Sequence, residues 1–184
     1  VPQQPSCAQA GYRRSQSQLM EALQSKRCGV LFVCLGNICR SPAAQGLLEQ
    51  ALEREQLSEH VEVDSCGTAA FNVGKAPDPR SVAAAARRDI DISQQIARQI
   101  HDDDYARFDF IVGMDRSNMS SIEAWAPSDF KGRIALLMDF CEQAQQRQIP
   151  DPYYAEAEAF DQVLDHIETG IEGLLKHLRS HLGH

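Results

Sequence analysis

An apolar segment that ends in a cysteine and leads within a few residues to a helix start is the feature that most restricts the fold of this chain. Val30 to Val33 is short, apolar and rich in β-branched residues, which is typical of a buried strand. Ser41 and Pro42 come shortly after it and predict a helix with a serine N-cap and a proline at its first position. A buried strand followed directly by a helix is the building unit of a parallel α/β sheet.

The same alternation of strand and helix patterns continues along the chain. Later strands are expected at 60–65 (HVEVDS), 108–115 (FDFIVGMD) and 133–140 (RIALLMDF). Helical segments are expected at 44–52, 78–90, 93–100, 117–126 and 160–178. The sequence therefore predicts a compact α/β domain over 28–184, a doubly wound sheet of four parallel strands flanked by helices on both faces. Ligands of such sheets bind beyond the carboxyl ends of the strands, where Cys34 stands.

Residues 1–27 differ from the rest in being basic, rich in Gln and Ser, and without a sustained apolar pattern. We expect a flexible extension, with an organelle-targeting peptide as the alternative. Apolar runs in the chain are too short to span a membrane, so a soluble protein is expected. The net charge of −8 argues against general nucleic-acid binding but leaves room for a small positive pocket that binds an anion.

The six cysteines have irregular spacing, with no Cys-x-x-Cys pair and no zinc-finger grouping with histidine. We expect mostly reduced thiols in a cytoplasmic protein, a disulfide scaffold being the weaker alternative. The histidines show no metal-binding spacing near the first loop. Three consecutive aspartates at 102–104 are expected to be the solvated start of a helix rather than a metal site.

The loop after the first strand has the chemistry of an anion site with a nucleophile. Gly36 and Asn37 tolerate left-handed backbone, which lets successive amides turn inward at the start of a helix. Arg40 adds a planar fork suited to two phosphate oxygens, and this positive environment favours a thiolate on Cys34. A thiolate beneath a bound phosphate predicts phosphoryl transfer through a phosphocysteine. The predicted phosphate-binding residues are Leu35, Gly36, Asn37, Ile38, Cys39 and Arg40. The alternative interpretation of this loop is a buried cysteine and an unrelated surface arginine.

A thiolate that displaces an aryl oxygen also needs a proton donor for the leaving group. Asp151 stands between two prolines in IPDPYY, on a stiffened loop that could hold a carboxyl group over the site. The alternative is an ordinary turn aspartate.

These segments together resemble the low-molecular-weight protein tyrosine phosphatases. VLFVCLGNICRSP, VDS, ARQI, FDFIVGMDRSN and DPYY occur in the order of that family, over about residues 28–181. The resemblance implies a phosphotyrosine phosphatase I-like fold and a two-step hydrolysis of phosphotyrosine and small aryl phosphates without metal or other cofactor. Its partners would be phosphotyrosine-containing proteins and inorganic phosphate, as product and competitive ligand, with neither nucleic acid nor membrane involved.

The family's roles carry over onto matching positions. By this resemblance Cys34 is the nucleophile, Arg40 binds the phosphate, and Asp151 is the general acid that later activates water. Ser41 matches the hydroxyl that eases departure of the thiolate. Asn37 and Ser65 match the residues that hold the shape of the loop.

The remaining carried-over positions each have an alternative. Asp115 matches a supporting carboxylate, or is the N-cap of the following helix. Cys39 matches a cysteine that can form a reversible disulfide with the nucleophile, or is a small packing residue. The substrate cleft would be walled by Phe71, Tyr153 and Tyr154, although Phe71 could equally lie in the core, and the tyrosine pair is phosphorylated in some relatives. Gln95 departs from the histidine that many eukaryotic relatives place in the network supporting the loop.

Two other functions use similar residues. A thiol-dependent arsenate reductase shares the fold and the loop, but it needs two further cysteines close together, and Cys66 and Cys141 are isolated in sequence. A catalytically silent phosphotyrosine-binding module is the second alternative, and retention of Cys34, Arg40 and Asp151 speaks against it.

Overall fold

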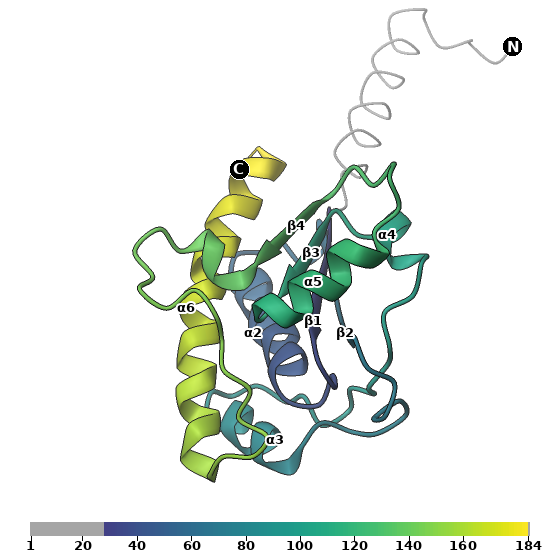
Figure 1. Cartoon of the computed structure of the whole chain (residues 1–184). Helices are drawn as coiled ribbons and strands as arrows, with labels where there is room; N and C mark the ends of the chain where they lie inside the picture. The colour runs from purple at the N-terminus through teal and green to yellow at the C-terminus, as the bar shows by residue number, and fades with distance from the viewer. Residues whose placement is uncertain (1–27, 184) are drawn as a thin grey trace, which may run out of the picture.

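Residues 28–183 are described by the computed structural model, and the predicted extension at 1–27 lies outside them. Strands and helices alternate along the chain as the sequence patterns predict (Figure 1). The elements are β1 (Cys28–Cys34), α2 (Arg40–Arg54), β2 (Val61–Gly67), α3 (Pro79–Ala86), α4 (Asp104–Arg107), β3 (Phe110–Gly113), α5 (Arg116–Trp125), β4 (Arg133–Leu136), the 3₁₀ helix η1 (Leu137–Phe140) and α6 (Ala157–Leu182).

The four strands form one sheet in the order β2-β1-β3-β4, and every neighbouring pair is parallel. The predicted four-stranded parallel sheet is therefore confirmed. β1 lies inside the sheet between β2 and β3, and each of its residues is buried. This position explains why the segment is continuously apolar rather than alternating, because both faces of a central parallel strand are covered.

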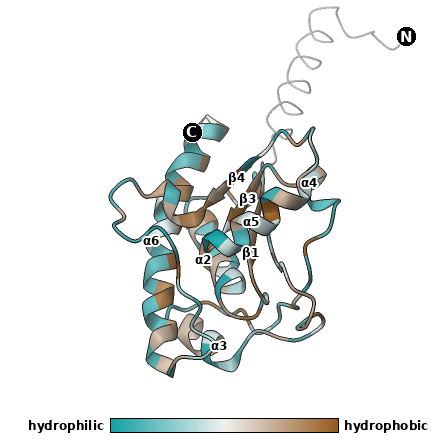
Figure 2. Cartoon of the chain, in the orientation of Figure 1, coloured by the Kyte–Doolittle hydropathy of each residue, from teal (hydrophilic) through white to brown (hydrophobic). Residues whose placement is uncertain are grey.

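The two faces of β1 belong to two separate clusters of buried side chains. Val30 and Phe32 point into a large core with α2, α3 and α6, whereas Leu31 and Val33 point into a smaller core with α4 and α5. Helices thus cover both faces of the sheet, which confirms the doubly wound arrangement (Figure 1). Figure 2 shows the apolar strands enclosed between helices whose outer faces are polar.

The long C-terminal helix closes the larger core. α6 buries residues at helical spacing along one side, as its amphipathic pattern predicts, and ends at Gly183 in the left-handed conformation. No helix in the described part of the chain is long and apolar enough to cross a membrane.

One strand prediction was only half right. The segment 133–140 is a strand only as far as Leu136, after which it continues as η1. The strand ends there because β3, its one neighbour in the sheet, ends at the paired residue Gly113. The Asp139 carboxylate then accepts a hydrogen bond of 3.1 Å from the Leu136 amide and stabilises the tighter turn.

The helical prediction for 93–100 was wrong. The segment is irregular and runs beside the end of β2, where Gly67 donates to the Arg98 carbonyl at 2.8 Å and accepts from the Ile100 amide at 2.9 Å. These hydrogen bonds to a strand replace those within a helix. The predicted solvated helix start at 102–104 was partly right, because α4 begins at Asp104 and the two aspartates before it are exposed. Asp104 itself is buried and accepts hydrogen bonds from the Arg98 guanidinium.

Candidate active site

Cys34 is the last residue of β1, and its side chain lies at the carboxyl edge of the sheet beneath the 35–39 loop. Asn37 adopts the left-handed conformation (φ 55°), and its amide donates to Cys34 Sγ at 3.3 Å. A β-carbon at Gly36 would lie 2.6 Å from the Asn72 side-chain nitrogen, which hydrogen-bonds to the Gly36 carbonyl. The loop therefore turns back over the sulfur only because these two positions hold Gly and Asn.

Ser41 does not cap the helix, and this part of the sequence prediction was wrong. The helix begins at Arg40, and Cys39 is its N-cap without a side-chain hydrogen bond. The Ser41 hydroxyl is buried and lies 3.0 Å from Cys34 Sγ, and it also accepts a hydrogen bond of 2.8 Å from the Asn37 side chain. It is thus engaged by the cysteine and the loop instead of by the amides at the helix start.

Arg40 lies almost fully buried beside Cys34, with 1% of its surface exposed. Its Nη1 donates to the Asp115 carboxylate at 2.7 Å and to the Ile149 carbonyl at 2.9 Å, and its Nη2 donates to Asp151 at 3.2 Å. Burial alone would lower the pKa of the guanidinium, but the charges of Cys34 and the nearby carboxylates raise it above its ordinary value. Arg40 therefore carries a fixed positive charge at the base of the site.

Asp115 makes both of the contacts that the sequence left as alternatives. One carboxylate oxygen accepts from the Asn118 amide and caps α5, while the other binds Arg40. Asp115 lies between the end of β3 and the start of α5, so these elements orient the Arg40 side chain, which comes from the start of α2, after the neighbouring strand β1.

A cavity of about 330 Å³ opens above Cys34. Asp151, Phe71, Tyr153 and Tyr154 all line it, although they lie far from Cys34 in sequence. Phe71 is 65% exposed, so the structure places it on the cavity wall and not in the core. Ser65 is not on the wall but behind the loop, where it accepts a hydrogen bond of 3.0 Å from Asn37. The loop residues that line the cavity are Leu35, Gly36, Ile38, Cys39 and Arg40.

Cys39 is a free, buried thiol on the same cavity. Burial is the main cause that raises its pKa far above the ordinary range, and the charge of Asp78 adds to the effect. The Cys39 thiol is therefore protonated at neutral pH and does not compete with Cys34 as a nucleophile.

Three residues that the sequence did not single out also belong to this site. Lys75 lines the cavity with Asn72, to which its ammonium group donates at 3.2 Å. Arg80 pairs with Asp78 and donates to the Tyr153 carbonyl at 3.0 Å, so it ties the DPYY loop to α3. The sequence gives no signal for these three residues, because each joins the site through a contact with a segment far away in the chain.

Gln95 partly replaces the histidine expected from the resemblance. Its amide nitrogen donates to the Pro42 carbonyl at 3.0 Å, within the first turn of α2. Its buried side-chain oxygen has no hydrogen-bond partner among the described residues. The glutamine thus supports the helix start through its amide nitrogen alone.

Gly67 packs directly against the loop, and we expect Gly67→Ala to damage the site. The added carbon would lie 2.8 Å from the Leu35 carbonyl oxygen, which is backbone and must move. We expect a loss of about 1–3 kcal/mol in unfolding free energy, as for other overpacked positions, and a fall in the turnover rate at this site. Thermal unfolding and kcat measured on the same sample would check this. Unchanged values of both would show that the loop accommodates the methyl group.

No cluster of three or more metal-ligating side chains that could hold an ion occurs within residues 28–183.

Comparison with known proteins places the chain among characterised families. The model of the family described as low molecular weight phosphotyrosine protein phosphatase matches residues 29–183. Low molecular weight phosphotyrosine protein phosphatase 1 of Drosophila melanogaster is 40% identical over 133 residues, which is 72% of this chain and 84% of that protein.

Solved structures agree with these sequence matches. A protein tyrosine phosphatase from Entamoeba histolytica, crystallised with Hepes in the active site, superposes with a TM-score of 0.80 at 33% identity, covering 83% of this chain and 97% of that one. A Drosophila protein named an arginine phosphatase superposes with a TM-score of 0.76 at 30% identity, covering 82% of this chain and 97% of that one.

Proposed function

The chain belongs to the low molecular weight phosphotyrosine protein phosphatase family, and from this premise we propose the roles of its individual residues in the hydrolysis of phosphotyrosine and small aryl phosphates. The observation that carries the proposal is the environment of Cys34. Its sulfur lies within hydrogen-bond distance of the Asn37 amide and the Ser41 hydroxyl, in a cavity shared with Arg40 and Asp151.

In the first step the Cys34 thiolate attacks phosphorus, and the bond to the aryl oxygen breaks. Arg40 binds two phosphate oxygens through its Nε and through the Nη2 hydrogen that does not contact Asp151, because its Nη1 is held by Asp115 and Ile149. The amides of the 35–39 loop and the start of α2 bind the remaining negative charge. Asp151, in its protonated form, gives its proton to the leaving phenolic oxygen.

In the second step the Asp151 carboxylate takes a proton from water, and the water oxygen attacks the phosphocysteine. The S–P bond breaks, releasing inorganic phosphate and returning the sulfur as a thiolate. The Ser41 hydroxyl, 3.0 Å from the sulfur, stabilises that thiolate by donating a hydrogen bond. Inorganic phosphate, as the product, also competes with substrate.

The walls of the cavity support selection of an aromatic substrate. Phe71 and the Tyr153–Tyr154 pair, whose rings stack edge to face with centroids 4.9 Å apart, present aromatic surface to a phenyl phosphate. Ile38 and Leu35 add apolar surface to the cavity lining. These walls provide no carboxylate for a guanidinium except Asp151, which favours phosphotyrosine over phosphoarginine.

We propose further that Cys34 and Cys39 form a reversible disulfide under oxidation and that the protein acts in the cytoplasm on phosphotyrosine-containing proteins. Both cysteines are free thiols on the same cavity, which supports the redox proposal. The Tyr154 side chain, also on the wall of this cavity, is 97% exposed, so it is accessible to a kinase.

Release of inorganic phosphate from three matched peptides tests the substrate class. We expect kcat/KM for a phosphotyrosyl peptide to exceed that for phosphoseryl and phosphoarginyl peptides by more than about tenfold, since aromatic contacts are worth about 1 kcal/mol each. A phosphoarginyl peptide turned over as fast as the phosphotyrosyl one would contradict the assignment. A chain that binds phosphotyrosine without releasing phosphate would instead be a binding module.

Reduction of arsenate with thioredoxin as electron donor distinguishes the remaining alternative. We expect no turnover, because a disulfide relay needs two further cysteines near the nucleophile, and among residues 28–183 only Cys39 lines the cavity with Cys34. Cys66 is buried on the opposite side of the sheet from Cys34, in the core with α4 and α5, and Cys141 follows η1.

A further inference from the structure

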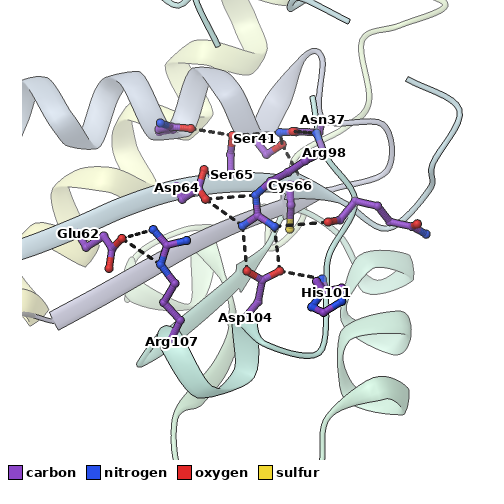
Figure 3. Close-up of polar contacts among 12 residues, drawn as sticks. Asn37, Ser41, Glu62, Asp64, Ser65, Cys66, Arg98, His101, Asp104 and Arg107 are labelled. Carbon is purple, nitrogen blue, oxygen red and sulfur yellow. Dashed lines mark hydrogen bonds and ion pairs between the residues drawn. The ribbon is translucent and has the colours of Figure 1, made fainter. Parts of the chain in front are cut away.

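Arg98 lies in a segment without regular secondary structure, yet its side chain forms hydrogen bonds with two carboxylates. Its guanidinium binds the Asp64 carboxylate through Nε and Nη2, at 3.2 and 2.9 Å, and the Asp104 carboxylate through Nη1 and Nη2, at 2.9 and 3.0 Å (Figure 3). Asp64 lies on β2 and Asp104 at the start of α4, so two elements fix one side chain. Asp104 is 4% exposed and also accepts from the His101 amide.

The backbone of Arg98 is held just as firmly. Its carbonyl accepts a hydrogen bond of 2.8 Å from Gly67 at the end of β2, and its amide donates at 3.0 Å to the side-chain oxygen of Asn37. A guanidinium clamped to two carboxylates and a carbonyl clamped to a strand leave the Arg98 amide pointing in one direction, toward the loop that carries the nucleophile.

That amide determines how the Asn37 side chain is oriented. An N–H group can only donate, so the oxygen of the Asn37 amide must face Arg98, and its nitrogen must face the hydroxyls of Ser41 and Ser65. Ser65 passes its own hydrogen to the Gln45 side chain at 2.8 Å. Ser41 accepts from Asn37, which leaves its hydrogen for the Cys34 sulfur or for the Cys66 carbonyl at 3.2 Å. The order of donors along this chain therefore keeps the Ser41 hydrogen available for donation to the sulfur, which is the stronger acceptor when it is a thiolate.

We propose that Arg98 is a positioning residue for the phosphatase reaction, which sets the Ser41 hydroxyl to stabilise the Cys34 thiolate by orienting Asn37. The proposal rests on the proposed function of Cys34. Arg98 does not contact the cavity itself, because it acts through the loop from behind.

The test compares Arg98→Gln with the wild-type chain in two measurements. We expect kcat for p-nitrophenyl phosphate to fall roughly 10- to 100-fold, as for misplacement of a catalytic group by about an ångström. We also expect alkylation of Cys34 by iodoacetate to shift its pH midpoint upward, because a thiolate without the Ser41 hydrogen bond is less stable. Alkylation of Cys34 by iodoacetate can be followed by mass spectrometry and does not depend on catalytic activity. This measurement therefore tests Arg98 even if the chain does not hydrolyse phosphotyrosine.

Arg107→Gln is the matched control. Arg107 pairs with Glu62 on the same strand as Asp64, but its side chain is half exposed and has no contact with Asn37 (Figure 3). We expect kcat within twofold of wild type and an unchanged alkylation midpoint. The conservative Arg98→Lys keeps the charge between the two carboxylates and should recover part of both losses.

Loss of Arg98 leaves the buried Asp104 without its cation, so Arg98→Gln could fail to fold. Asp64→Asn then replaces it, because it removes one side of the fork and leaves the buried pair intact. We expect a smaller upward shift of the alkylation midpoint in that variant. A folded Arg98→Gln or Asp64→Asn protein with the wild-type midpoint and kcat would overturn the proposal.

Discussion

Cys34→Ser is expected to lower turnover of p-nitrophenyl phosphate by about 10⁴-fold or more, because loss of the nucleophile in a covalent mechanism removes most of the rate enhancement. A serine hydroxyl at this position is a much weaker nucleophile than a thiolate. Binding of inorganic phosphate, measured by titration calorimetry, is expected to be equal or tighter. The reason is that Arg40 and the loop amides remain, while the negative charge of the thiolate is gone.

Cys141→Ser is the matched control for this substitution. Cys141 is a partly buried thiol after η1, away from the cavity, and we expect its replacement to leave turnover unchanged. Substantial hydrolysis by Cys34→Ser, or trapping of phosphate on another residue in that variant, would remove Cys34 from its proposed role.

Asp151→Asn is expected to affect substrates according to their leaving group. For phenyl phosphate we expect kcat/KM to fall by about 10²- to 10⁴-fold, since protonation of a basic phenolate contributes that much. For 2,4-dinitrophenyl phosphate, whose leaving group needs no proton, the fall should be small. Because kcat/KM reports the formation of the phosphocysteine, the later role of Asp151 in activating water does not enter this comparison.

Asp129→Asn provides the control, since Asp129 is an exposed loop aspartate outside the residues that line the cavity. We expect it to leave kcat/KM unchanged for both substrates. If Asp151→Asn lowered kcat/KM equally for both leaving groups, Asp151 would not be the acid, and its contact with Arg40 would be structural.

Most of the sheet could be predicted because each strand carries a local signal. β1 is continuously apolar since it is central, and the left-handed turn after it could be predicted from Asn37, a residue type that tolerates this conformation. The helix prediction for 93–100 failed because hydrogen bonds to Gly67, a residue far away in sequence, outweigh the helix-like apolar spacing of the segment. The predicted end of β4 was wrong for a related reason, since the length of β4 depends on the length of its neighbour β3.

The candidate site divides in the same way. The nucleophile loop could be predicted because its residues are consecutive and their chemistry follows from their types. The local pattern assigned Ser41 to the helix N-cap, which was wrong, whereas the resemblance matched it to the hydroxyl beside the thiolate, and the structure places it 3.0 Å from the Cys34 sulfur. Asp115 was left undecided between two contacts, and the structure shows that its two oxygens make both.

The sequence by itself determined the order of strands and helices, the loop that joins Cys34 to Arg40, and the resemblance that assigns the family. The sequence also proposed Asp151 for the site, but tertiary structure alone decided that Lys75 lies on the cavity wall and that Arg98 lies behind Asn37. The physical reason is that the two kinds of interaction act over different separations along the chain. Backbone preference and apolar periodicity act between near neighbours in the chain, whereas a hydrogen bond or ion pair acts between whatever groups packing brings within about 3 Å of each other.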